Sequence, residues 1–424
     1  MSRVKRISFL AFLAISATIS SVAQIANSPF SSFGVGDLHG TGFAQNQGMG
    51  GVGISNPSSW YINNQNPALL TYNFVTTFQA GMILENRTVN DGISSVKSAN
   101  GNLNYLALAF PVLSGRWTTS LGLMPYSTAK YKFSVVEPVL NDQKNTVLSQ
   151  KTGTGGLTQF YWSNGVKINK YLAVGGRASY YFGSILSEET QTLNQNRLIL
   201  FYPLINTLSY AKGFGFSPAI YLHKDSISKK NFRISVGAVY DFKSDLKSEV
   251  STRIDQRSFR GQINDSTTIS NEGSILVLPQ SYGGGISFGR PGFWTIAADL
   301  TVLDYNQFKD FNGKTAATTT GIKSGVGFEY TPDRTGVSNY LRRITYRTGV
   351  SYEKYPYLVG SNEIKDYGIN FGVSLPVGSI STIDLSLKIG KRGSILQNSI
   401  DENYFKLYFG MTFNDRWFIK RKFD

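Results

Sequence analysis

The chain has no cysteine and only two histidines among its 424 residues. Without cysteine it can form no disulfide framework and carry no lipid on an N-terminal thiol, so its own fold must hold it together. Neither His39 nor His223 has a serine or an acid beside it in a recognisable nucleophile arrangement. No group of histidine and acidic residues has metal-ligand spacing either. We therefore expect no enzyme, no cofactor and no metal, and a hydrolase assembled only by the fold stays open as an alternative.

Long apolar runs are also absent after the N-terminus. The longest, Tyr105 to Leu113, has nine residues and contains a proline, whereas a membrane-spanning helix needs about 20. The first residues differ, because Arg3, Lys5 and Arg6 precede an apolar stretch and the small residues Ser21-Val22-Ala23. This pattern is typical of a secretory signal peptide, predicted at 1–23.

Helical spacing of apolar residues is missing as well, and strict alternation stands in its place. In the last such segment Phe405, Leu407 and Phe409 alternate with polar or small residues. Alternation over about ten residues, joined by gaps that are alternately short and long, is typical of an outer-membrane β-barrel with short turns in the periplasm. A soluble sandwich could alternate too, but it leaves the rhythm of the gaps unexplained. The fourteen predicted strands are 74–84, 103–112, 115–125, 157–168, 171–184, 212–223, 231–243, 280–289, 293–303, 321–331, 344–354, 366–376, 381–390 and 403–413.

The fold class is therefore all-β, a transmembrane antiparallel barrel of about 14 strands over 73–413. Seven polar residues are predicted to face its interior: Arg177, Arg233, Asp299, Arg347, Asp384, Lys388 and Lys406. They either fill the lumen with ion pairs and hydrogen bonds or bind a ligand carboxylate.

The charge is basic, with 42 Lys and Arg against 27 Asp and Glu. The basic residues are scattered through turns and loops without a nucleic-acid-binding motif, so no nucleic-acid partner is expected. Contact with outer-membrane lipid headgroups explains the charge as well. Asp142 and Glu188-Glu189 are interpreted as solvated loop charges, with a cation site as the alternative.

Residues 24–72 do not alternate. They are rich in glycine and asparagine, yet contain aromatic and aliphatic residues that favour burial. A barrel of this size leaves a lumen that side chains alone do not fill, so we predict that this segment forms a hatch inside it. Gly48-Met49-Gly50-Gly51-Val52-Gly53 matches the dinucleotide fingerprint in form, but no strand precedes it and no helical pattern follows. We assign Gly48, Gly50 and Gly51 to the hatch.

The segment directly before the first strand, Asn66-Pro67-Ala68-Leu69-Leu70, resembles the Asn-Pro-Ala hatch motif of the FadL/TodX family of outer-membrane hydrophobic-compound transporters. The runs Leu278 to Gly285 and Tyr346 to Tyr352 resemble that family too. The resemblance implies a fourteen-stranded barrel, a lumenal hatch that includes Asn66, Pro67 and Ala68, and ligand diffusion toward the hatch or a lateral opening.

The expected function is passive uptake of a hydrophobic small molecule, of the long-chain fatty acid or hydrocarbon class. Its capture site is predicted in loop 185–211, where an apolar run would be costly to expose. The alternative is a structural or secretion-partner barrel of the PorV type, binding a protein through loops 185–211 or 244–279 or through a basic-aromatic periplasmic tail, 414–424. The tentative ligand-binding residues are Leu198, Leu200, Phe201, Tyr202, Arg177 and Arg347.

Overall fold

The computed structural model describes most of the chain. The predicted signal peptide, Leu198, Leu200 and most of the predicted tail lie outside the described residues. The residues that the structure describes are 28–139, 142–193, 201–227, 231–258, 260–316, 318–333, 339–377 and 381–415.

Fourteen antiparallel strands of the described chain close into a barrel, because the last strand pairs with the first along its whole length. Each overlaps one of the fourteen predicted segments, so the predicted fold class is confirmed. The strands are β2 (Thr76–Asn90), β3 (Ser95–Leu113), β4 (Trp117–Pro125), β6 (Asp142–Lys167), β7 (Leu172–Leu193), β8 (Phe201–Ile227), β9 (Phe232–Asp241), β12 (Gln280–Arg290), β13 (Trp294–Asp304), β14 (Gly321–Tyr330), β15 (Thr345–Val359), β16 (Asn362–Val377), β17 (Ser381–Ser394) and β18 (Ile400–Asp415).

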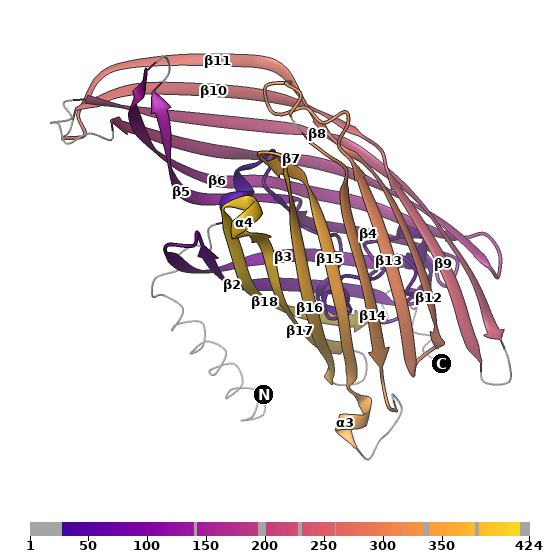
Figure 1. Ribbon diagram of the computed structural model, residues 1–424. Helices are drawn as coiled ribbons and strands as arrows, with labels where there is room; N and C mark the ends of the chain where they lie inside the picture. The colour runs from indigo at the N-terminus through magenta and orange to yellow at the C-terminus, as the bar shows by residue number, and fades with distance from the viewer. Residues whose placement is uncertain are drawn as a thin grey trace, which may run out of the picture.

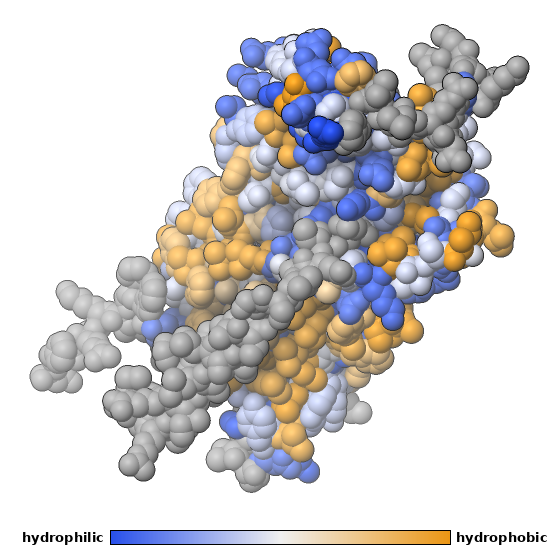
Figure 2. Space-filling model, turned by 90° about the vertical axis from the view of Figure 1, so that its left-hand side faces the viewer, coloured by the Kyte–Doolittle hydropathy of each residue, from blue (hydrophilic) through white to orange (hydrophobic). Residues whose placement is uncertain are grey.

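The alternation places apolar side chains outside and polar ones inside. In β18, Phe405 is 44% exposed whereas Tyr404 is 4% exposed. The outward apolar residues form a band around the middle of the molecule, with hydrophilic residues at both ends (Figure 2). Among the described residues, no helix has the length and hydrophobicity to cross a membrane.

Three further strands lie beyond the barrel on the side of the long connections. They are β5 (Ser127–Val139), β10 (Ser244–Ser258) and β11 (Ile263–Leu278). Together with the extended ends of β6, β7 and β8 they form a six-stranded sheet, which we call the extension, in the order β5-β6-β7-β8-β10-β11 (Figure 1). The prediction of loops at 185–211 and 244–279 is therefore wrong. Water reaches most of β11, so no apolar face marks that strand in the sequence.

The chain before β2, residues 28–73, runs inside the barrel, and we call it the N-terminal segment. It contains η1 (Pro29–Ser32), β1 (Asp37–Leu38), α2 (Ala44–Gln47) and η2 (Pro67–Tyr72). Two other short helices, α3 (Tyr340–Arg343) and α4 (Ile395–Asn398), lie in connections between strands. The N-terminal segment contacts the wall on opposite sides, with η2 against β4, β6, β7 and β8 and α2 against β16, β17 and β18.

The N-terminal segment touches the wall where the wall strands have glycine. A Cβ atom on Gly349 would lie 2.4 Å from the carbonyl carbon of Met49, and one on Gly237 would lie 2.2 Å from the carbonyl oxygen of Ile54. Because no side chain tolerates such distances, glycine is required there for close backbone approach. The wall glycines in such contact, which we call the glycine seat, are Gly165, Gly175, Gly237, Gly325, Gly327, Gly349 and Gly372.

The lipid-facing band predicts a difference between two similar isoleucines. Ile286 of β12 is 60% exposed in the band, and Ile269 of β11 is 58% exposed in the extension. We expect Ile286→Arg to destabilise the barrel by about 2–4 kcal/mol, the cost of Arg at the bilayer midplane. The matched Ile269→Arg replacement faces water and should change stability little. Unfolding by urea in lipid vesicles measures both, and equal effects would contradict the placement of the band.

The glycine seat predicts that Gly349→Val is destabilising, because the new side chain must displace Met49 and Gly50 or bend β15. Overpacking of this kind costs about 1–3 kcal/mol. The control is Gly284→Val in β12, whose Cβ would meet no atom within 4 Å. Heat-dependent mobility in gel electrophoresis should show a lower unfolding temperature for Gly349→Val alone. An unchanged temperature would mean that the N-terminal segment is free to move.

Candidate functional site

A cavity of about 330 Å³ lies between the N-terminal segment and the extracellular end of the barrel. Its floor is made by 39–42 and 50–54 of the N-terminal segment, and its sides by strands from all round the barrel. Half of the acidic, basic and histidine side chains that line it come from β2, β14, β16, β17 and β18. A cavity on this floor is separated from the periplasm by the full thickness of the N-terminal segment.

An apolar cluster, which we call the aromatic mouth, lies beside this cavity at the end of the barrel that carries the long connections. Tyr305, Phe308 and Phe311, from the connection after β13, pack against Leu246 of β10 and Tyr357 of β15. The aromatic rings meet edge to face, with centroids 5.6 Å apart for Tyr305 and Tyr357, a favourable arrangement for buried aromatic residues. Phe33 and Val35 of the N-terminal segment join the same cluster.

A network of buried ion pairs crosses one side of the cavity, and we call it the ionic cluster. Arg392 of β17 reaches Asp37 of the N-terminal segment at 2.9 Å and Asp366 of β16 at 3.2 Å. Lys388 also contacts Asp366, at 3.3 Å. Burial by itself would raise the pKa of Asp37, but Arg392 beside it holds that pKa below its usual range. Asp37 therefore stays ionised and paired.

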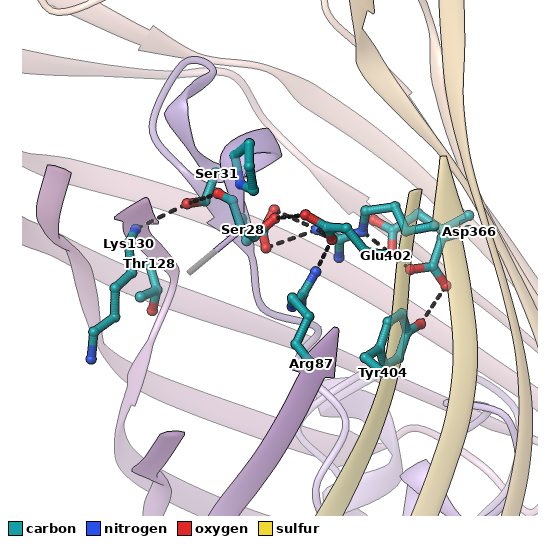
Figure 3. Close-up of polar contacts among 12 residues, drawn as sticks. Ser28, Ser31, Arg87, Thr128, Lys130, Asp366, Glu402 and Tyr404 are labelled. Atoms are coloured by element: carbon teal, nitrogen blue, oxygen red, sulfur yellow. Dashed lines mark hydrogen bonds and ion pairs between the residues drawn. The ribbon is translucent and has the colours of Figure 1, made fainter. Parts of the chain in front are cut away.

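A second part of the ionic cluster joins the strands at which the barrel closes. Arg87 of β2 pairs with both Glu85 and Glu402 of β18, and Lys406 contacts Glu85 at 3.4 Å. Arg87, Glu402 and Tyr404 converge in Figure 3. Breaking one pair would leave a buried charge without its partner, which costs several kcal/mol.

The start of the N-terminal segment connects this cluster to β5 on the other side (Figure 3). The Ser28 hydroxyl donates to Glu402 at 2.6 Å, and the Ser28 N–H donates to the carbonyl of Lys130 at 3.0 Å. Further along, β1 pairs with Ser127 and Thr128 of β5. His39 lies 2.8 Å from the Thr128 hydroxyl, and burial lowers the pKa of this histidine to about 4. His39 is therefore neutral at physiological pH.

Among the described strands, backbone pairing in the wall is interrupted at the level of the cavity. β3 pairs with β4 only between Leu106 and Leu113, and β5 pairs with β6 and β1. Among the described residues, the extracellular half of β3 (95–105) and β5 therefore face each other without backbone pairing, and we call this margin the seam. Lys130 Nζ lies 3.3 Å from Asn100 Oδ1 across it. Asn100 and Lys130 both line the cavity, so the cavity reaches the seam.

The Asn-Pro-Ala motif lies at the base of the N-terminal segment. Asn66 caps η2 by accepting from the Ala68 N–H at 3.0 Å, and its amide donates to the carbonyls of Ile54 and Ile220. Pro67 begins η2, and Ala68 is fully buried against Gly175 of β7. The motif thus ties the segment to β7 and β8.

The three predicted hatch glycines lie on the opposite side. Gly48 meets Gly372 of β16, and a Cβ on Gly50, whose φ is +74°, would lie 2.5 Å from the carbonyl oxygen of Val350. Gly51 has a φ of +83°. Gly50 and Gly51 thus have the left-handed conformation that glycine adopts without strain.

The predicted ligand-binding residues that the structure describes are not brought together. Arg177 lines the cavity, but its guanidinium donates to the Asn64 carbonyl at 2.7 Å and to Asp241 at 2.9 Å. Arg347 pairs with Glu329 at 2.7 Å, below the cavity. Phe201 and Tyr202 belong to β8 in the extension. Both arginines form hydrogen bonds or ion pairs inside the barrel. This is the arrangement of the first interpretation given for the inward polar residues, in which they fill the lumen.

The sequence did not identify the residues that shape the seam. Asn100, Lys130 and Asp37 lie in segments whose pairing depends on contacts distant in the chain. Glu402 and Arg87 did carry a signal, because each occupies an inward position of a strand, where a charge needs a partner. Among the described residues, no group of three or more acidic or histidine side chains could hold a metal ion.

Comparisons with known proteins agree on the architecture. The toluene transporter TodX of P. putida superimposes with a TM-score of 0.60 and 14% identity, covering 89% of this chain and all of TodX. A FadL homologue of Pseudomonas aeruginosa gives 0.58 and 11%, covering 89% and 99%, and the CymD monoaromatic hydrocarbon channel gives 0.55 and 14%, covering 90% and 98%. No curated protein matches the chain.

The model of one protein family, described as BamG, matches residues 3–424. The match spans the whole barrel and the N-terminal segment. The chain therefore belongs to the BamG family, and it has the fold of the FadL/TodX-type outer-membrane transporters.

Proposed function

We propose that the protein lets hydrophobic small molecules, of the long-chain fatty acid or hydrocarbon class, enter passively through the outer membrane. The observation that carries the proposal is the seam, because Asn100 and Lys130 on its two margins both line the cavity and no backbone pairing joins these margins among the described residues. The similar structures include a toluene transporter, a monoaromatic hydrocarbon channel and a FadL homologue. The route needs no catalytic step and no cofactor.

The N-terminal segment acts in this proposal as a fixed hatch. The glycine seat leaves no space for it to slide, and hydrogen bonds such as those from Gly53 and Ile54 to Asp299 hold its backbone. An apolar ligand would also have to displace the ionic cluster to move down the lumen, at a high desolvation cost. The ligand instead passes from the aromatic mouth to the seam and from there into the outer leaflet.

The seam can be closed by a covalent link. Because the chain has no cysteine, Asn100→Cys/Lys130→Cys would carry the only thiols, one on each margin. A short bifunctional thiol reagent should reduce uptake of radiolabelled oleate and toluene at least five-fold. Uptake would be measured in cells that lack their own hydrophobic-compound transporter, with a reducible reagent so that reduction restores it.

The control pair is Thr88→Cys/Lys97→Cys, at two positions that already face each other in the paired strands β2 and β3. The same reagent there adds a link without closing an opening, so uptake should not change. Full uptake with a closed seam would overturn the lateral route. Loss of uptake in both pairs would point to a general effect of cross-linking.

A second candidate function, a partner barrel that binds another protein, is favoured by one observation. β11 is the last strand of the extension, and its residues 263–273 are exposed and pair only with β10 among the described residues. A free strand edge is a template for pairing with another chain. This edge falls within the predicted partner segment 244–279, whereas the predicted tail lies mostly outside the described residues.

The partner hypothesis predicts a site-specific contact in intact cells. A photo-crosslinking amino acid at Ile269 should give one discrete adduct, and the same residue at Leu396 of α4 should give none. Both side chains are well exposed, so exposure alone does not favour either site. An adduct at both positions, or at neither, would argue against a docking edge at β11.

A further inference from the structure

The short turns at the periplasmic end of the barrel share one chemical feature. Each of the five that the structure describes in whole or in part has an exposed basic side chain in it or beside it. We call these residues the basic rim. They are Arg116 between β3 and β4, Lys170 between β6 and β7, Lys224 near the end of β8, Arg290 between β12 and β13, and Arg342 between β14 and β15.

Among the described residues, no ion pair joins any of the five rim residues to an acid. The acid beside Lys224, Asp225, is already paired with Arg233. At the other end of the barrel some basic residues have acidic partners, as in Lys391 with Asp401 at 2.8 Å and Lys354 with Glu363 at 3.1 Å. Others at that end, such as Lys97 and Lys132, are exposed like the residues of the rim.

Exposed aromatic residues lie next to the basic rim. Trp117 follows Arg116 and Tyr171 follows Lys170 in the chain, and the Arg290 guanidinium lies 4.1 Å from the ring centre of Phe293. Aromatic residues of this kind gather where a membrane protein crosses the lipid–water interface. Basic side chains beside them can extend their charge to the level of the headgroups.

We propose that the basic rim binds the headgroups of anionic phospholipids in the periplasmic leaflet. The basic residues are spread over turns from β3 to β15, whereas a protein partner would cover one side of the barrel. For Arg116, Lys170 and Arg290, the neighbouring aromatic residues also place the charge at headgroup height. An attraction of this kind falls off with salt, because it acts between exposed charges.

The proposal can be tested by tryptophan fluorescence in phosphatidylcholine vesicles. Trp117 and Trp294 lie at the rim, so a brominated lipid bound there quenches them. The protein should select brominated phosphatidylglycerol over brominated phosphatidylcholine about five-fold at low salt, the preference that one basic residue near the headgroups supports. One molar salt should remove the preference.

Two variants with five substitutions each distinguish the effect of the basic rim from the effect of total charge. R116Q/K170Q/K224Q/R290Q/R342Q should lose the preference, and K97Q/K132Q/K247Q/K309Q/K314Q, at exposed extracellular lysines, should keep it. Heat-dependent gel mobility confirms that both variants are folded. Equal quenching by the two lipids in the unaltered protein would overturn the proposal. It would do so even if the rim bound an acidic protein instead of lipid. So would an unchanged preference in the rim variant.

Discussion

The arrangement of the lumen depends on the contact between the backbone of the N-terminal segment and the backbone of the wall. At Gly349 and Gly237 the two chains approach so closely that even a methyl group would collide. A barrel of this size would otherwise hold an aqueous channel. Because glycine removes the side-chain layer, forty-odd residues are enough to fill the lower lumen. The polar groups of that segment can then reach the wall, as Gly53 and Ile54 do at Asp299.

The start of the N-terminal segment has a second role, besides the part of the segment that forms the fixed floor of the cavity. Residues 28–38 leave the floor and lie along β5, where Ser28 and β1 pair with it, while Asp37 reaches Arg392 on the far side of the cavity. The segment is therefore both the base of the cavity and a cover on one margin of the seam. Any opening of the seam has to be local, because the rest of the segment is held by the glycine seat.

The sequence allowed the barrel to be predicted strand by strand, because lipid on one side and a polar interior on the other force the alternation. It failed for β5, β10 and β11, three of the six strands of the extension. In β11 the reason is that both faces are exposed over most of the strand. The Asn-Pro-Ala motif could be recognised from local residues, since Asn66 bonds within its own turn. Of the ionic cluster, Lys388 and Lys406 were predicted to face the interior, but the pairing of Arg87 with Glu402 was not predicted, because the two residues are 315 positions apart. The glycine seat did leave a signal, since glycine inside a strand often marks a close backbone approach.

A polar lumen does not rule out a hydrophobic ligand, because the ligand can leave through the seam instead of through the floor of the cavity. Movement through the floor would separate Arg392 from Asp37 and Asp366 and lift the segment off the glycine seat. Each buried charge left unpaired adds several kcal/mol. Movement through the seam has to break the partly exposed hydrogen bond between Lys130 and Asn100. Water can replace this bond for both side chains. In the proposed route the charged interior therefore stays in place, and the ligand crosses the wall at the seam, where fewer buried interactions have to be broken.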